Sequence, residues 1–157
     1  MPDSTLSAAE RALLHEFDRR GVRFLVVGMS AALLHGARGA TEDIDLWFED
    51  PSDPRIAEAV RAAGGFWISG AFGGGPAIGG EELSERFDVV WRLDGLEPFD
   101  VEFRDACYQD VDGILLPVLP LHRIIASKQA AGRAKDKAAL ESLQDALTIL
   151  EHGTEED

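Results

Sequence analysis

Two kinds of hydrophobic pattern alternate along the chain, and together they predict helices interleaved with strands. Apolar residues at helical intervals follow the capping-box stretch Ser7-Ala8-Ala9-Glu10, so a first helix is expected to end near Gly21. The apolar run at residues 22–28 is rich in β-branched side chains, which predicts a buried central strand. Further helices are expected at 29–36, 51–65, 121–133 and 134–153, and further strands at 42–48, 66–69, 86–95 and 111–120.

Three segments have less regular patterns. Residues 98–109 fit a strand or a helix equally well. The strand expected at 111–120 contains Pro117, which has no N–H to donate to a ladder, so this strand is expected at a sheet edge. The glycine-rich stretch at 70–80 lacks the Gly-Lys-Ser/Thr ending of a P-loop, and we interpret it as a mobile flap beside a site or as disorder.

The alternation of elements predicts an α/β fold, and the composition is that of an ordinary globular protein. Hydrophobic residues make up 45% and charged residues 28% of the 157 residues. A chain of this length suits one domain with a real core. We therefore expect a single domain at residues 1–152 and a frayed acidic tail at 153–157.

Charge and cysteine usage narrow the class of protein. The net charge of −14 argues against general nucleic-acid binding, although a bound metal ion would add positive charge that this count omits. The lone Cys107 cannot form an internal disulfide and suits a reducing compartment. The start of the chain lacks a signal-peptide pattern, and no apolar run approaches the roughly 20 residues of a membrane helix. We expect a cytoplasmic protein with no membrane partner.

The candidate chemistry begins in the stretch ATEDIDLWFED at residues 40–50. Aspartate is depleted in strands, yet Asp43 and Asp45 stand one residue apart in a segment that otherwise fits a strand. Strand side chains alternate between faces, so both carboxylates point the same way. The pair is either a solvated strand face or a metal site.

The preceding segment favours the metal site. The central strand ends at Val27-Gly28, and a helix starts at Met29-Ser30, so unpaired backbone N–H groups at the turn could bind an anion. A hairpin-like return of the chain would place the two aspartates beside that turn. Magnesium binds carboxylates and phosphate oxygens together, which is what phosphoryl or nucleotidyl transfer requires. Asp88, on the polar face of its strand, is the candidate third carboxylate, with Asp100 and Glu102 as a rival pair.

A lysine and a group of basic residues complete the candidate site. Lys128 continues the apolar stripe of Leu121, Ile124 and Ile125 at helical spacing, so it is either a snorkelling lysine or a group that reaches a phosphate or an aspartate. The basic residues near it are Arg123, Arg133, Lys135 and Lys137. They either belong to the site or are solvated helix ends with Asp136 as a cap. His35 is expected to pack or to bond a turn, and Cys107 to be structural.

The ordered set of these motifs resembles a known family. The segment VVGMSAALLHG followed by TEDIDLWF is similar to the nucleotidyltransferase superfamily signature, and most similar to the AbiEii-type group of bacterial abortive-infection and toxin–antitoxin systems. Apolar strand residues around Asp88, a helix lysine at Lys128 and the stretch AAGRAKD at 130–136 extend the resemblance over residues 22–143. The family HG and T-x-D-I-D-L motifs are matched by His35, Gly36, Thr41, Asp43, Ile44, Asp45 and Leu46.

The resemblance implies a minimal nucleotidyltransferase fold, a small mixed sheet flanked by helices with the C-terminal helices packed on one side. It implies transfer of a nucleoside monophosphate from an NTP to an acceptor hydroxyl. Two Mg²⁺ ions, for which Mn²⁺ can substitute, are expected on the catalytic carboxylates Asp43, Asp45 and Asp88. The residues expected to bind the nucleotide are Gly28, Met29, Ser30, Thr41 and Lys128.

Two positions depart from the family pattern. Met29 stands where the family has glycine or serine, and Gly39 where arginine is common. Both departures concern nucleotide binding, so a catalytically inactive protein that binds a nucleotide or a partner protein is the alternative function. The acceptor is open between RNA (tRNA), protein and small molecule, and a toxin–antitoxin role would add a cognate partner protein.

Overall fold

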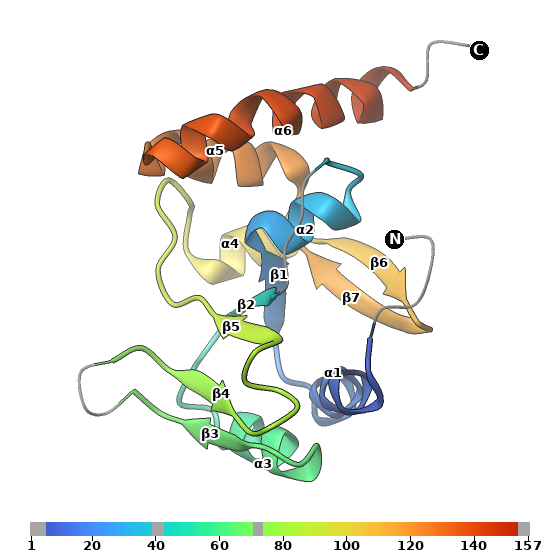
Figure 1. Ribbon diagram of the computed structural model, residues 1–157, viewed down its shortest axis with the longest axis vertical. Coiled ribbons are helices and arrows are strands. Elements are labelled where there is room, and N and C mark those ends of the chain that lie inside the picture. Colours follow the sequence, from blue (N-terminus) through green and yellow to red (C-terminus); the bar gives the residue numbers. More distant parts are fainter. Residues whose placement is uncertain (1–5, 39–42, 71–73, 154–157) are drawn as a thin grey trace.

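The computed structural model describes residues 6–38, 43–70 and 74–153. Within them, five strands form one mixed sheet in the order β5-β2-β1-β7-β6, and β3 and β4 form a separate pair (Figure 1). The strands are β1 (Phe24–Val27), β2 (Ile44–Phe48), β3 (Phe66–Ile68), β4 (Ala77–Gly79), β5 (Phe87–Val89), β6 (Cys107–Val111) and β7 (Ile114–Val118). The helices are α1 (Ala8–Arg20), α2 (Gly28–Leu34), α3 (Pro54–Ala62), α4 (Phe99–Arg104), α5 (Leu121–Ala131) and α6 (Ala134–His152).

The sheet is mixed, as the family resemblance implied. Strand β1 runs antiparallel to β2 and parallel to β7, while β2 is parallel to β5 and β6 is antiparallel to β7. Helices α1 and α3 contact each other at one end of the molecule, and α5 and α6 pack together at the other (Figure 1). The predicted α/β fold with C-terminal helices on one side is therefore confirmed.

The core lies around β1, whose four residues are all buried. Its Phe24 joins Phe17 of α1 and Phe48 of β2 in an aromatic cluster with ring centroids 5.3–6.2 Å apart. Tilted and edge-on contacts of this kind add to the hydrophobic gain of burying large rings. A strand covered on both faces must be apolar throughout, and this explains the continuous run in the sequence.

Local signals set several helix ends where the sequence predicted them. The Ser7 hydroxyl accepts from Glu10 N–H and the Glu10 carboxylate accepts from Ser7 N–H, so the capping box that starts α1 is present. Gly21 and Gly132, both left-handed, end α1 and α5. A left-handed residue after a helix is cheapest as glycine, which explains why α5 and α6 part at Gly132.

Pro117 does not mark an edge strand, so that prediction was wrong. Strand β7 lies inside the sheet, between β1 and β6. The register pairs β1 with β7 at Val26 and Val118, one residue beyond the proline. Leu119 N–H then donates to Val26 O at 2.9 Å. The ladder with β1 thus begins only after Pro117, and the missing N–H is tolerated there.

Strand β5 is shorter than the predicted strand at 86–95. It spans Phe87–Val89, and Trp91 is 58% exposed. The chain after β5 passes close to α5 at Gly95. A Cβ added at Gly95 would lie 2.6 Å from the Ala130 Cβ. The ambiguous segment at 98–109 contains both elements, helix α4 followed by the start of β6.

The glycine-rich stretch at 70–80 is partly regular. Its last part forms β4, which pairs antiparallel with β3 beside α3, away from α5 (Figure 1). The expectation of disorder is therefore wrong for that part, while a mobile flap stays a prediction and residues 71–73 lie outside the described residues. None of the helices in the described part of the chain combines the length and hydropathy needed to cross a membrane.

Candidate active site

The candidate site is built by the register of three strands. Asp45 of β2 pairs with Val27, the last residue of β1, and with Asp88 of β5. Paired positions on neighbouring strands project from the same face, and Asp43 precedes Asp45 by two residues. The predicted hairpin-like return is confirmed, and the sheet directs Asp45 and Asp88 to one face beside the end of β1. The strand expected at 42–48 begins at Ile44, so Asp43 lies just before it, near enough for its charge to raise the pKa of both carboxyls.

These carboxylates influence one another electrostatically. The pKa of Asp45 is raised from 3.8 to about 6, first by burial and then by the charges of Asp88 and Asp43. Asp88 keeps much of its surface in water, and its pKa is raised by partial burial and then by Asp43, while Lys135 opposes the rise. Like charges disfavour ionisation of each other, so the site is a place where positive charge would be stabilised.

Gly28 brings the backbone close to Asp45. It has φ +65°, and a Cβ built on it would lie 2.5 Å from the Asp45 Oδ2 atom. Only glycine allows both this left-handed conformation and this approach. The predicted position of Gly28 at the turn beside the aspartates is therefore met by the geometry, and the strand-to-helix turn and the carboxylate form one unit.

Ser30 supports Asp45 through its side chain. Its hydroxyl accepts from the Asp45 N–H at 3.0 Å and donates to the Val27 carbonyl at 2.9 Å. The Ser30 Oγ lies 3.5 Å from the Asp45 Oδ2. Because the residue is buried and these bonds occupy the hydroxyl, the side chain positions β2 against the turn. Nucleotide binding by Ser30 stays a prediction for its backbone N–H.

The remaining nucleotide-binding predictions have different outcomes. Met29 is partly buried and packs against the hydrophobic core. Thr41 and the departure at Gly39 lie outside the described residues.

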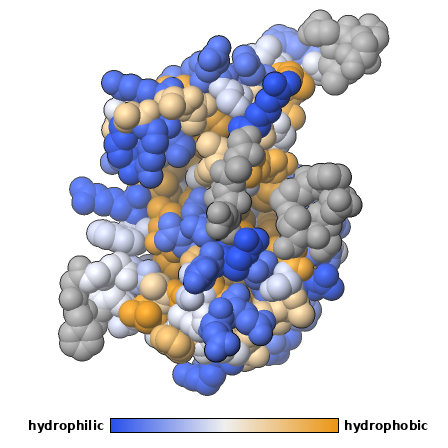
Figure 2. All heavy atoms as spheres, in the orientation of Figure 1, coloured by the Kyte–Doolittle hydropathy of each residue, from blue (hydrophilic) through white to orange (hydrophobic). Residues whose placement is uncertain are grey.

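A cleft of about 330 Å³ opens beside the β1–α2 turn. Three elements form it: the turn at Gly28, the segment after β5, and the corner between α5 and α6. Its basic residues are Arg92, Lys128 and Arg133, and its acidic residues are Asp94 and Asp136. Figure 2 shows hydrophilic side chains over the corner where α5 meets α6. The cleft therefore combines cations with a wall of apolar side chains in a chain whose net charge is strongly negative.

Lys128 is a paired cation rather than a snorkelling one. Its side chain is 19% exposed, and its Nζ lies 3.4 Å from Asp136 Oδ1. It also lowers the pKa of Asp45, so it lies within electrostatic reach of that carboxylate. One of the two interpretations made Asp136 the cap of a solvated helix end, and Asp136 is instead fully buried. As the only acid between residues 121 and 140, it could have been recognised as unusual from the sequence.

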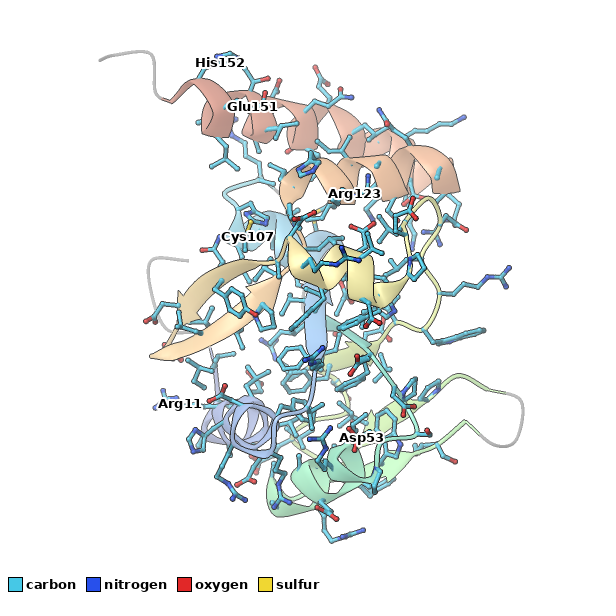
Figure 3. The ribbon with its side chains drawn as sticks, turned by 180° about the vertical axis from the view of Figure 1, so that it is seen from behind. Arg11, Asp53, Cys107, Arg123, Glu151 and His152 are labelled. Atoms are coloured by element: carbon cyan, nitrogen blue, oxygen red, sulfur yellow. The ribbon has the colours of Figure 1, made fainter. Side chains whose placement is uncertain are left out.

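The basic residues do not act as one cluster. Arg133 and Lys128 pair with Asp136, whereas Arg123 points toward α4 (Figure 3) and its Nη2 lies 2.6 Å from Glu102 Oε2. Glu102 is 3% exposed and Asp100 is exposed, because α4 is a helix and directs positions two apart to different sides. The two carboxylates therefore do not share one face, and Asp100 and Glu102 do not form the rival pair that the sequence allowed.

His35 and Cys107 have structural surroundings. The His35 Nε2 lies 2.8 Å from the Leu119 carbonyl, and its Nδ1 lies 3.4 Å from the Gln109 side-chain nitrogen. His35 thus links the end of α2 to the start of α5, which confirms the prediction of a packed, bonded residue. Cys107 is a half-buried free cysteine at the start of β6.

The donor set suits magnesium. Asp43, Asp45 and Asp88 offer only oxygen ligands, in a place where burial and mutual repulsion favour a cation. Among the residues described, no group of three or more Asp, Glu, His or Cys side chains could hold a metal ion, so Asp43, Asp45 and Asp88 do not form a three-ligand site by themselves. Magnesium is usually held by one or two carboxylates together with phosphate oxygens and water, so a closed protein cage is not required.

Comparison with known proteins places this geometry in a fold class. No protein-family model matches the chain, and no curated protein matches it. Solved structures do match. ANT(2")-Ia, in complex with adenylyl-2"-tobramycin, aligns with a TM-score of 0.60 at 18% identity, covering 89% of this chain and 86% of that chain. The lincosamide antibiotic adenylyltransferase LnuA, with lincomycin bound, aligns with a TM-score of 0.61 at 11% identity, covering 92% and 99%.

A nucleotidyltransferase-like protein from Paracoccidioides brasiliensis has a TM-score of 0.58 at 14% identity, over 95% of this chain and 79% of that chain. The chain therefore has the fold of nucleotidyltransferases, as the ordered motifs implied. At these identities the likeness shows the fold alone.

Proposed function

We propose that this protein is a metal-dependent nucleotidyltransferase that moves a nucleoside monophosphate from an NTP to an acceptor hydroxyl. The observation that carries the proposal is the pairing of Asp45 with Asp88 beside the Gly28 turn, next to a cleft that contains Lys128. Carboxylates beside a cleft that contains Arg92, Lys128 and Arg133 are a combination that suits phosphoryl-group chemistry.

The reaction balances without any further reactant. The acceptor oxygen forms a bond to the α-phosphorus of the NTP as the bond from that phosphorus to the bridging oxygen breaks. The electron pair of that bond leaves with pyrophosphate, and the acceptor proton passes to a base. Positioning and charge stabilisation account for most of such catalysis.

Magnesium is the expected cofactor, and Mn²⁺ can substitute for it. Asp43 and Asp45 would hold the ions, and Asp88 would act on the acceptor side. Bound there, the ions would supply positive charge and orient the phosphate oxygens.

The side chains have separate tasks in this proposal. Asp88 accepts the acceptor proton, a task that suits a carboxyl whose pKa is raised by partial burial and by Asp43. Lys128 and Arg133 offset phosphate charge from the α5–α6 side of the cleft, and Arg92 does so from the segment after β5. The backbone at Gly28 approaches the phosphates where a side chain would block them.

The acceptor class is the open part of the proposal. ANT(2")-Ia and LnuA, as named, carry antibiotic-derived molecules, which makes a small-molecule hydroxyl one candidate. RNA and protein hydroxyls are the others, and the net charge of −14 weighs against tRNA. The resemblance to the AbiEii-type group adds a toxin–antitoxin role with a cognate partner protein, and the lone Cys107 suits a cytoplasmic setting.

The test is transfer of label from each α-³²P NTP to tRNA, protein and small-molecule fractions with Mg²⁺. The proposal expects one NTP and one fraction to become labelled by wild type and not by Asp45→Asn. A matched control is Asp100→Asn, an exposed aspartate on α4 outside the site. Label transferred equally by wild type and Asp45→Asn would overturn the assignment of the site.

A second candidate is a catalytically inactive protein that binds a nucleotide or a partner protein. The departure at Met29 favours it, because the turn carries a long side chain where glycine or serine would leave open space. Calorimetric titration of each NTP with Mg²⁺ separates the two candidates. Binding without transfer to any fraction supports the inactive protein, and binding with transfer supports the enzyme.

A further inference from the structure

Of the two acids that line the cleft, Asp94 is exposed and Asp136 is buried. Its exposed fraction is 0%, and it lies in the first turn of α6. Its Oδ2 accepts from the Arg133 Nε at 2.6 Å and from the Arg133 N–H at 3.2 Å. Its Oδ1 lies 3.4 Å from the Lys128 Nζ. One buried carboxylate therefore holds both cations that the α5–α6 corner contributes to the cleft.

Helix capping alone does not require this arrangement. A cap needs one oxygen that accepts one backbone N–H, and Asp136 accepts from Arg133 N–H in that way. Asp53, the N-cap of α3, accepts from the Arg55 N–H, and its ion-pair partner Arg55 is likewise close in sequence. The pair with Lys128 is different, because it crosses from α6 to α5 and closes the left-handed turn at Gly132.

Besides Asp136, Lys128 lies within electrostatic reach of a second carboxylate. It influences Asp45 electrostatically, and Asp45 is half-buried with two further carboxylates near it. A lysine on a long flexible stem moves to the carboxylate that offers the stronger attraction. Without Asp136, Lys128 would be drawn to Asp45 and would occupy the oxygens that a metal ion needs.

We propose that Asp136 is a positioning residue that keeps Lys128 away from Asp45 and holds it, with Arg133, at the cleft wall where the NTP phosphates lie. This inference rests on the proposed function, because it assigns the cleft to the nucleotide. Asp136 acts through Lys128 and Arg133, and it touches neither the substrate nor the reacting atoms.

The test uses the full chain and two probes, Mn²⁺ alone followed by its EPR signal, and each NTP with Mg²⁺ followed by calorimetry. Asp136→Asn keeps an oxygen for the cap and removes the charge. It is expected to weaken NTP binding at least about tenfold, the scale of one lost charge-assisted contact. It is also expected to weaken Mn²⁺ binding, because the freed Lys128 competes for Asp45.

The double variant Asp136→Asn with Lys128→Met separates positioning from structure. It is expected to bind Mn²⁺ as wild type does, since the competing ammonium group is gone. Its NTP binding is expected to stay weak. A merely structural loss would not be repaired by a second substitution. The matched control is Glu102→Gln, which breaks an equally buried ion pair to α5 at Arg123, outside the cleft. It is expected to change neither affinity.

Each outcome decides a different claim. If wild type binds no NTP, the proposed function fails and this inference fails with it. If wild type binds an NTP and Asp136→Asn binds it equally well, only this inference fails. Should Asp136→Asn not fold, Lys128→Met decides alone. If Lys128→Met binds Mn²⁺ within about threefold of the wild-type affinity, the inference is supported. If its Mn²⁺ affinity rises by more, Lys128 already occupies Asp45 in wild type and the inference is overturned.

Discussion

Asp45 on β2 and Asp88 on β5 are register partners in a parallel pair of strands, so their side chains leave the same face of the sheet at the same level. The pairing places two acids together that repel each other, and the pKa of Asp45 rises to about 6 through burial and this repulsion. A bound cation would relieve this repulsion, because an opposite charge nearby favours the ionised form of both carboxyls. The predictions below follow from this relationship and from the turn beside it.

Asp45→Asn should remove stabilisation by Mg²⁺ and NTP while the fold stays intact. A ligand at about 100 times its Kd stabilises the native state by about 2.7 kcal/mol, and this gain requires the carboxylate. The measurement is thermal unfolding with Mg²⁺ and NTP against unfolding in chelator. Without ligands the variant should be at least as stable as wild type at pH 7, since one repelling charge is gone. Persistent stabilisation by Mg²⁺ in Asp45→Asn would refute a metal site at Asp45.

The free energy of unfolding should depend on pH through Asp45. Its pKa is 3.8 in the unfolded reference and about 6 in the native state. Between these values the native state binds more protons, so without metal this carboxyl makes stability fall as pH rises from about 4 to about 6. Magnesium competes with the proton, so its stabilising effect should grow through pH 6. Urea titrations at several pH values, with and without Mg²⁺, measure both trends. In Asp45→Asn the part of the pH dependence that Asp45 causes should be lost, together with the growth of the Mg²⁺ effect through pH 6.

Asp88→Asn should abolish transfer and largely spare nucleotide binding, because Asp88 acts on the acceptor side. An asparagine cannot accept the acceptor proton as a carboxylate does. The comparison is the NTP Kd from calorimetry against the transfer rate in single turnover. Asp100→Asn should leave both quantities unchanged. The reverse ranking of the two variants would move the site to α4.

Gly28→Ala should damage the site more than its backbone strain explains. Gly28 and Gly36 both have positive φ, +65° and +98°, so alanine costs about 1–2 kcal/mol at either position. An added Cβ meets Asp45 Oδ2 at 2.5 Å from Gly28, but nothing within 4 Å from Gly36. We expect Gly28→Ala to lose about 1–3 kcal/mol more than Gly36→Ala in urea unfolding, together with Mg²⁺ affinity. Equal losses in the two variants would show that the approach to Asp45 is unimportant.

Local sequence determined the helix ends and the central strand. The Ser7–Glu10 box, Gly21 and Gly132 act within one turn of chain, so their effect can be predicted from neighbours alone. The continuous apolar run predicted that β1 would be buried on both faces. The spacing of Asp43 and Asp45 predicted a shared direction, because strand side chains alternate between faces.

Only the tertiary structure decided which partners these groups meet. The position of β7 made Pro117 internal, and the helical form of α4 separated Asp100 from Glu102. The packing of α6 on α5 buried Asp136 beside Lys128, and the order of the strands placed Asp88 next to Asp45. Each of these features either joins elements that are distant in sequence or depends on which structure an ambiguous segment adopts. Burial and charge pairing depend on that global arrangement, whereas capping and strand alternation depend only on adjacent residues.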